Sequence, residues 1–257
     1  MNPTLSTLLA ETDRQKAQLD AARPLPEETV ASLREVLTLD WTYNSNAIEG
    51  NTLTLQETKV VLEGITVGGK TLREHLEATN HRDAIECVEE IVAKREALTE
   101  WQIKNIHSLV LRGISDKDAG RYRQGNVLIG GASTVPPDAV HVPQEMNALL
   151  VWYERSAALH PVERAAELHT RFVKIHPFID GNGRTGRLLL NFELMKSGYP
   201  PAVIRTQDRQ TYYRVLDEAC VTGVYDGIST PVAEAVQRTL TLYLGLIGGG
   251  LSKNGQP

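Results

Sequence analysis

The segment HPVERAAELHTRFVKIHPFIDGNGRTGRLLLNFELMKSGYPP, residues 160–201, contains the features that decide the fold of this chain. Its first part predicts a helix that begins at Pro161, because apolar residues recur there at helical spacing. The pair His176-Pro177 ends that helix, and Asp180-Gly181-Asn182-Gly183 follow, four residues that favour turns and tolerate positive φ. A second helix is predicted from about 184 to 196. The segment therefore predicts two helices joined by a glycine-rich turn.

The rest of the chain has mostly the same helical pattern. Segments that are amphipathic and end near glycine or proline occupy residues 3–20, 27–50, 55–64, 71–96, 99–113 and 231–248. The glycine-rich tail GGGLSKNGQP, which follows the last of them, is expected to be disordered. The fold class predicted for the body of the protein is therefore all-α.

One stretch, residues 120–143, interrupts the helical pattern with four glycines and three prolines. Two short β-like runs at 126–129 and 139–142 predict a hairpin. Because two strands alone are only marginally stable, we expect a small β-hairpin flap carried on the helical core. Such a flap can bind an extended peptide along its backbone edge. A connector without function is the alternative interpretation.

The composition is that of an ordinary soluble protein with a slight acidic excess. The 257 residues are 41% hydrophobic and 23% charged, with a formal net charge of -5. No apolar run approaches the ~20 residues of a membrane span, and the start lacks the basic region of a signal peptide. Two distant cysteines, Cys87 and Cys220, predict neither a disulfide framework nor a zinc cluster. We expect a cytoplasmic protein without a nucleic-acid partner.

The turn at 180–183 predicts an anion-binding site. Backbone N–H groups converge in such a turn, and the following helix adds the partial positive charge of its N-terminus. Arg184 and Arg187 lie three positions apart and can bind outer phosphates. Asp180 is placed to hold Mg²⁺ beside phosphates, and His176 is suited to proton transfer near neutral pH. The alternative is a purely structural turn between two core helices. His169, seven positions before His176, is expected to be a packed core histidine.

These residues resemble the Fic family. HPFIDGNGRTGR at 176–187 matches the Fic motif HPFx(D/E)GNGRxxR at every fixed position. The resemblance extends to GRYRQGNVLIG at 120–130 and to Tyr212-Tyr213, and covers roughly residues 39–226. It implies an all-α core with a hairpin flap, and transfer of AMP from ATP to a Ser, Thr or Tyr hydroxyl of a target protein. No P-loop signature occurs, and the lysine of the related Doc kinases is absent.

The resemblance also implies a role for each matching residue. His176 would be the catalytic base, and Asp180 would bind Mg²⁺ or Mn²⁺ against the phosphates. The ATP-binding residues would be Val127, Leu128, Ile129, Gly130, Asp180, Gly181, Asn182, Gly183, Arg184, Arg187, Tyr212 and Tyr213. Cys220 stands where the family often has an asparagine that contacts the base, so the chain departs from the family pattern in the base pocket.

Upstream, Ser45-Asn46-Ala47-Ile48-Glu49-Gly50 resembles the (S/T)xxxE(G/N) motif of the family's inhibitory helix. Ser45 and Glu49 are four positions apart, so one helical face can present both. The resemblance implies that Glu49 pairs with a motif arginine, Arg187, and restrains transfer. An ordinary helix end with a solvated glutamate is the alternative.

We expect the chain to consist of three regions. Residues 1–97 would carry the inhibitory motif, 98–235 the catalytic core with its flap, and 236–257 the end of the last helix and the tail.

Two alternatives to AMP transfer stay open: removal of AMP from a modified protein, and nucleotide sensing without catalysis. The protein target is not identified, automodification is possible, and inhibitory-helix members often form homodimers.

Overall fold

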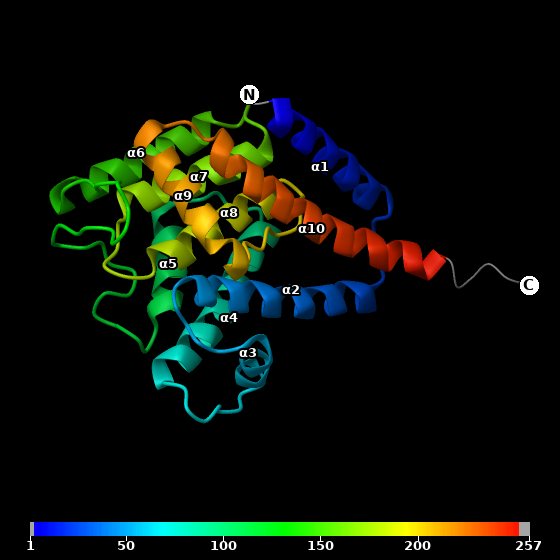
Figure 1. The fold of residues 1–257 in the computed structure, drawn as a ribbon, viewed down its shortest axis with the longest axis horizontal. Helices are drawn as coiled ribbons and strands as arrows, with labels where there is room; N and C mark the ends of the chain where they lie inside the picture. The colour runs from blue at the N-terminus through cyan, green and yellow to red at the C-terminus, as the bar shows by residue number, and fades with distance from the viewer. Residues whose placement is uncertain (1–2, 252–257) are drawn as a thin grey trace, which may run out of the picture.

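A computed structural model describes residues 3–251, and the side chains of residues 5–247. Within that range the chain forms helices and irregular loops, with no strand. The helices are α1 (Pro3–Ala21), α2 (Glu27–Ile48), α3 (Leu55–Leu62), α4 (Leu72–Ala93), α5 (Glu100–Leu111), η1 (Ala139–His141), α6 (Val142–Arg155), α7 (Pro161–Ile175), α8 (Asn182–Lys196), η2 (Thr206–Asp208), α9 (Arg209–Thr222) and α10 (Asp226–Leu251) (Figure 1). The all-α prediction is confirmed.

Helix α8 lies at the centre of the fold. Its apolar residues Leu188, Leu189, Leu190 and Phe192 are all buried, and it packs against α7, α4, α5 and α2. The polar residues Arg187, Asn191 and Glu193 of α8 are buried as well, so protein surrounds the helix on every side. The N-terminal end of α8, which carries the glycine-rich turn, is therefore held by helices on several sides.

Capping boxes set the starts of three helices. Thr54, Thr71 and Thr99 each accept a hydrogen bond from the backbone N–H of the third residue of the helix, whose side chain binds back to the cap. Two otherwise unpaired N–H groups are satisfied in each case. Because these signals are local, the starts of α3, α4 and α5 can be read from the sequence.

The N- and C-terminal helices pack against each other. Leu5, Leu9 and Leu19 of α1 join the same buried cluster as Val236 and Leu240 of α10, and Figure 1 shows the two helices side by side. Helix α10 extends through Leu251, and the remainder of the predicted tail, residues 252–257, lies outside the described residues. Among the described residues, none of the helices combines the length and apolar character of a membrane span.

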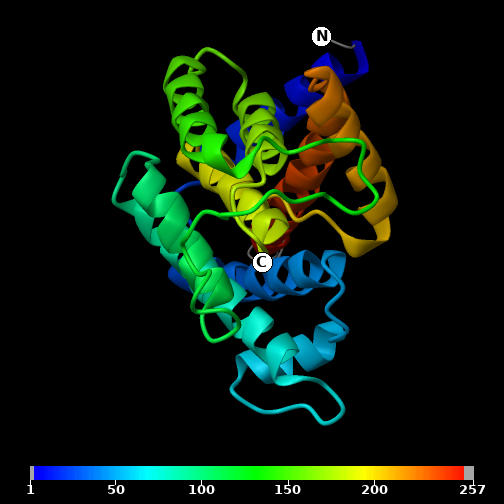
Figure 2. The same ribbon diagram turned by 90° about the vertical axis from the view of Figure 1, so that its left-hand side faces the viewer.

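The predicted β-hairpin at 120–143 is wrong. Side chains, and not a backbone ladder, join the two arms of the loop: Asn126 Nδ2 donates to Asp138 at 2.7 Å, and Asn126 Oδ1 accepts from Ala139 N at 2.8 Å. Two consecutive prolines at 136–137 supply no N–H donor for strand pairing, and residues 139–141 form the 3₁₀-helix η1. The flap is an irregular loop, which Figure 2 shows crossing in front of α8 toward α9.

Candidate active site

A cavity of about 700 Å³ opens at the N-terminal end of α8. Its volume lies within the ~300–1,000 Å³ of small-molecule sites. Four elements form the walls: the end of α2, the flap loop, the α7–α8 junction and α9. The lining residues are Glu49, Ile129, Gly130, Gly131, Ala132, Thr134, Val173, His176, Gly183, Arg187, Arg209, Gln210, Tyr212, Tyr213, Arg214, Leu216, Asp217 and Cys220.

His176 lies at the C-terminal end of α7 in the left-handed conformation, with φ 49° and ψ 57°. Its N–H donates to Phe172 O at 3.1 Å, and its carbonyl accepts from Arg123 Nε at 2.9 Å. A non-glycine residue held at positive φ at a cavity wall is a sign of a functional constraint. Burial lowers the pKa of His176, so the imidazole is neutral at pH 7 and able to accept a proton.

The turn after His176 is shaped by backbone conformation and by Asn182. Gly181 has φ 77°, a left-handed value that favours glycine. The Asn182 side chain accepts from Phe178 N at 3.0 Å and donates to Phe178 O at 2.8 Å, so it holds the turn closed. Gly183 lies on the cavity wall. Its N–H belongs to the first turn of α8, where N–H groups have no partner within the helix.

Asp180 is surrounded by cations. Its carboxylate lies 2.6 Å from Arg73 Nη2 and 3.3 Å from Arg184 Nη2, and it accepts from Gly181 N at 2.6 Å. Although burial raises the pKa of Asp180, these partners together hold it below its usual range. Arg184 also lies 3.2 Å from Glu77. Asp180 is therefore ionised, but it does not line the main cavity.

Arg187 makes a buried connection to the predicted inhibitory motif. Its Nε donates to Ser45 Oγ at 3.0 Å, and Nη2 donates to Ser45 O and to Glu49 Oε1, both at 2.8 Å. Burial opposes the charge of Arg187, but Glu49 and the nearby tyrosines raise its pKa, and the guanidinium stays charged. Nη1 is buried without a hydrogen-bond partner. Arg187 itself lines the cavity, so its positive charge is close to any anion that binds there.

The end of the cavity that was predicted to bind the adenine base is polar, but its polar side chains are hydrogen-bonded to other groups of the protein. Tyr212 OH lies 2.6 Å from His169 Nε2, in agreement with the packed core histidine expected at 169. Tyr213 OH donates to Ile48 O at 3.3 Å, beside the motif at 45–50. The Cys220 thiol donates to Thr170 O at 3.6 Å, and burial raises its pKa to about 11. Cys220 thus lines the cavity as a neutral thiol.

The flap residues divide into two groups. Ile129 and Gly130 line the cavity, whereas Val127 and Leu128 do not, and Leu128 is 86% exposed. Beyond them, Ser133 N and Thr134 N donate to the Asp217 carboxylate at 2.8 and 2.9 Å. This contact attaches the far arm of the flap to α9.

Gly50, the last residue of the predicted inhibitory motif, has φ 96° and follows the end of α2.

Sequence reasoning did not find Arg73, Glu77, His107 or Asp217. Each is an ordinary residue within an amphipathic helix, and no local pattern distinguishes it from a solvated or packed neighbour. Each is close to the site only because α4, α5 and α9 pack around the N-terminal end of α8. No sequence signal could have identified them.

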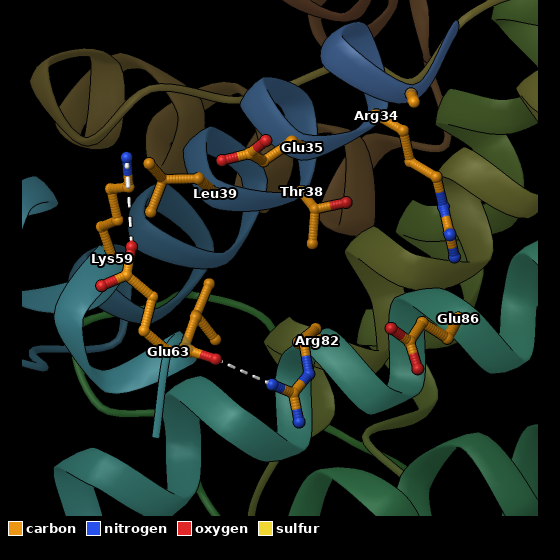
Figure 3. Close-up of a pocket in the computed structure, with 10 residues that line it drawn as sticks. Arg34, Glu35, Thr38, Leu39, Lys59, Glu63, Arg82 and Glu86 are labelled. Carbon is orange, nitrogen blue, oxygen red and sulfur yellow. Dashed lines mark hydrogen bonds and ion pairs between the residues drawn. The ribbon is translucent and has the colours of Figure 1, made fainter. Parts of the chain in front are cut away.

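A second cavity, of about 340 Å³, lies between α2, α3 and α4 (Figure 3). None of the predicted site residues lines it. Its basic side chains have partners: Lys59 pairs with Glu63 at 4.0 Å, and Arg82 donates to Leu62 O at 3.1 Å. This groove has none of the features of the α8 site.

The fold and the site define a class of all-helical protein with a histidine, a glycine-rich turn and a cavity at the N-terminus of one helix. Residues 97–194 match the Fic/DOC family. A Fic domain containing signaling protein from Bacteroides thetaiotaomicron is 30% identical, with a TM-score of 0.80 over 93% of this chain and 98% of that one. The chain belongs to the Fic/DOC family.

Two further relatives extend the comparison. A fragment of Fic-1 from C. elegans has a TM-score of 0.87 and 29% identity, covering 96% of this chain and 74% of that chain. Protein adenylyltransferase Fic of Nematostella vectensis is 41% identical over 206 residues, 79% of this chain and 48% of that protein. The chain therefore spans about half the length of the curated relatives it matches.

Proposed function

We propose that this chain is a protein adenylyltransferase that transfers AMP from ATP to a Ser, Thr or Tyr hydroxyl of a target protein. One observation carries the proposal: a neutral His176, the charged Arg187 and Gly183 of the glycine-rich N-terminus of α8 line one cavity. A base and an anion site together suit nucleotidyl transfer. The names of the relatives support the same activity for the family.

In the proposed reaction, His176 accepts the proton of the target hydroxyl. The hydroxyl oxygen attacks the α-phosphorus of ATP, the bond to the β-phosphate oxygen breaks, and pyrophosphate leaves. The N–H groups of residues 181–183, with Arg187 and Arg184, bind the phosphates. Catalysis of this kind depends mainly on positioning and charge stabilisation. Asn182 contributes through the shape of the turn, since its side chain binds Phe178.

A divalent cation, Mg²⁺ or Mn²⁺, would be held by Asp180. Within the described residues no cluster of three or more His, Cys, Asp or Glu side chains forms a protein-only metal site. A single carboxylate beside a phosphate site fits Mg²⁺, which takes one or two carboxylates and completes its shell with phosphates and water. When bound, the ion would supply charge neutralisation on the phosphates. Arg73, which is exposed, would have to leave Asp180.

Glu49 is proposed to inhibit transfer. Its carboxylate lines the cavity and occupies the arginine that the γ-phosphate would otherwise bind. ATP that binds without Arg187 would lie in a pose unsuited to attack. The Ser45 contacts hold Arg187 in place on the other side, and Gly50 allows the chain to turn directly after the motif.

A second activity, removal of AMP from a modified protein, is favoured by the same observation. Glu49 and His176 line one cavity, so Glu49 is placed to align a water molecule for hydrolysis. Nucleotide sensing without catalysis has no comparable support, because binding alone would not need a base at 176.

The partners and the organisation of the chain are also proposals. The target protein would dock on the flap, where Leu128, Val135 and Val140 are exposed. Ile129 and Gly130, with Tyr212 and Tyr213, would contact the adenosine, and Val127 and Leu128 the target. Automodification and a homodimer are further proposals. The division into 1–97, 98–235 and 236–257, and a cytoplasmic location in keeping with two free cysteines, are retained as proposals.

The deciding experiment incubates the purified chain with ATP labelled on the α-phosphate, with Mg²⁺, with and without cell lysate. Transfer predicts label on protein, and release of labelled AMP from a pre-modified protein predicts the reverse activity. The matched control is His176→Ala, which should retain ATP binding and lose both reactions. Binding of ATP without either reaction, in the wild type and in Glu49→Gly, would leave only a sensing role.

A further inference from the structure

We infer that His107, on α5 and outside both sequence motifs, is a positioning residue for AMP transfer: its two ring nitrogens join the base of the flap to the catalytic turn. The inference rests on the proposed function. His107 does not line the cavity, and it contacts Asp180 at the backbone carbonyl and not at the carboxylate, so it would act through the backbone that it holds.

The hydrogen bonds of His107 determine its tautomer. Gly120 N donates to Nδ1 at 2.9 Å, and Nε2 lies 2.9 Å from the carbonyl oxygen of Asp180. A backbone N–H can only donate and a carbonyl can only accept, so Nδ1 carries the lone pair and Nε2 carries the hydrogen. A neutral ring with this tautomer satisfies both partners. A doubly protonated ring would lose the bond to Gly120.

The surroundings hold the ring in one orientation. His107 has 0% exposure, and its ring stacks on Phe178 with centroids 3.5 Å apart and an angle of 3° between the planes. On the far side, a Cβ at Gly181 would lie 3.3 Å from Nε2, which helps explain why glycine occupies that position. Burial lowers the pKa of His107 to about 4, which preserves the neutral ring under ordinary conditions.

Both segments that His107 holds lead directly to the site. On one side, the Asp180 carbonyl belongs to the turn that supplies the proposed metal carboxylate and phosphate amides. On the other, Gly120 leads to Arg123, whose N–H donates to Pro177 O at 2.9 Å and whose Nε donates to His176 O at 2.9 Å. The base of the flap, the catalytic histidine and the turn thus form one closed set of contacts that includes His107.

Phosphate-binding groups must be placed closely, and a displacement of about 1 Å can cost about 100-fold in rate. Loss of the bond from Nε2 to Asp180 would free the turn relative to His176, whereas loss of the bond from Gly120 would free the flap. The two bonds therefore have different consequences, and they can be removed separately.

Two conservative variants separate them. In His107→Gln the side-chain amide reaches the position of Nε2 and can still donate to Asp180 O. In His107→Asn the amide oxygen reaches the position of Nδ1 and can still accept from Gly120 N. Both variants are made in the full chain carrying Glu49→Gly, and melting temperatures identify any variant that does not fold.

Transfer of labelled AMP gives kcat and KM, and hydrogen–deuterium exchange gives an independent readout of the peptides around 118–124 and 178–185. We expect His107→Asn to lower kcat about 10- to 100-fold with faster exchange in the turn, and His107→Gln to stay within about threefold with faster exchange near Gly120. Equal kcat and equal exchange in the two variants would overturn the inference. If the Glu49→Gly parent transfers no AMP, the proposed function fails, and the exchange pattern still decides whether His107 holds the turn.

Discussion

Arg73 of α4 and Asp180 of the turn before α8, 107 positions apart in the sequence, form an ion pair of 2.6 Å. Arg73 also binds Glu77 at 3.0 Å, and Glu77 lies 3.2 Å from Arg184. Asp180 is thus neutralised by protein cations. The Arg73 side chain is 55% exposed, so its pair with Asp180 is worth only about 0–1 kcal/mol. A bound cation can therefore replace it at little cost.

Replacement of Arg73 by glutamine should strengthen metal binding. Without the Arg73 guanidinium, Asp180 has only Arg184 as a cationic neighbour among the described residues. A divalent ion therefore no longer has to displace the ion pair with Arg73. We expect the Mg²⁺ concentration at half-maximal ATP binding to fall about two- to fivefold, the range of an exposed pair. Calorimetric titration at fixed ATP measures it. Arg34→Gln, which removes an exposed pair with Glu89 far from the site, is the control, and an equal response in both variants would contradict the prediction.

Substitution of Glu49 by glycine should raise AMP transfer about 10- to 100-fold, because a charge-assisted pair with buried Arg187 contributes about 1.5–3 kcal/mol. The freed guanidinium can then bind the γ-phosphate. Any hydrolytic removal of AMP should be lost in the same variant. Initial rates of automodification with labelled ATP are compared with those of the wild type.

Ser45→Ala is the graded control for this experiment. It removes one bond to Arg187 Nε but leaves Glu49 in place, so its effect on the rate should be smaller. Equal rates in wild type and Glu49→Gly would mean that the segment at 45–50 is an ordinary helix end.

The pH dependence of transfer should follow His176. Burial places its pKa below the usual 6.5, so the base is neutral at pH 7 and the rate should fall only as the pH drops below 6.5. The measurement is kcat in Glu49→Gly from pH 5.5 to 8, with circular dichroism at each pH to show that the protein remains folded. A rate that rises toward acid would be incompatible with His176 as the base.

The stability of the fold should also decrease at acidic pH, but for a different reason. Burial lowers the pKa of His107 to about 4 and that of His169 to about 3. The unfolded chain takes up protons below 6.5, whereas the folded chain does not until about these values, so stability declines as the pH falls from 6.5 toward 4. Urea unfolding at several pH values measures the slope, which should become shallower in His107→Gln. An unchanged slope in that variant would contradict the lowered pKa.

Gly186→Ala should destabilise the fold. A Cβ there would lie 2.7 Å from Nδ1 of the fully buried His169 and 3.0 Å from the partly buried Val173. Overpacking of this kind costs about 1–3 kcal/mol, which exceeds the helix propensity gained, so Tm should fall by about 2–8 °C. The matched control is Gly245→Ala in α10, where nothing lies within 4 Å of the added Cβ and stability should rise slightly. A Tm that is equal or higher in Gly186→Ala would contradict the packing argument.

The sequence predicted the helices well where their signals were local. The predicted starts at 55, 71, 99 and 161 each depend on neighbours within a few residues, and the structure shows capping threonines at 54, 71 and 99 for the first three. The prediction of a β-hairpin in the flap was wrong because the conformation of this loop depends on contacts between residues that are not close in the sequence. The β-like run at 126–129 suggested a strand, but Asn126 binds Asp138 and Ala139 through its side chain, and nothing in the local sequence indicates such contacts.

By itself, the sequence determined the helical class, the glycine-rich turn after His176 and the two motifs at 45–50 and 176–187, because these depend on backbone preference and short spacing. The structure shows the contact between Glu49 and Arg187 that the resemblance implied, but only the tertiary structure decided that Arg73 pairs with Asp180 and that His107 joins Gly120 to Asp180. Contacts between residues 13 to 138 positions apart depend on how whole helices pack around α8, and a charged or aromatic residue at a helix surface has the same local pattern whether its partner is water or a distant side chain.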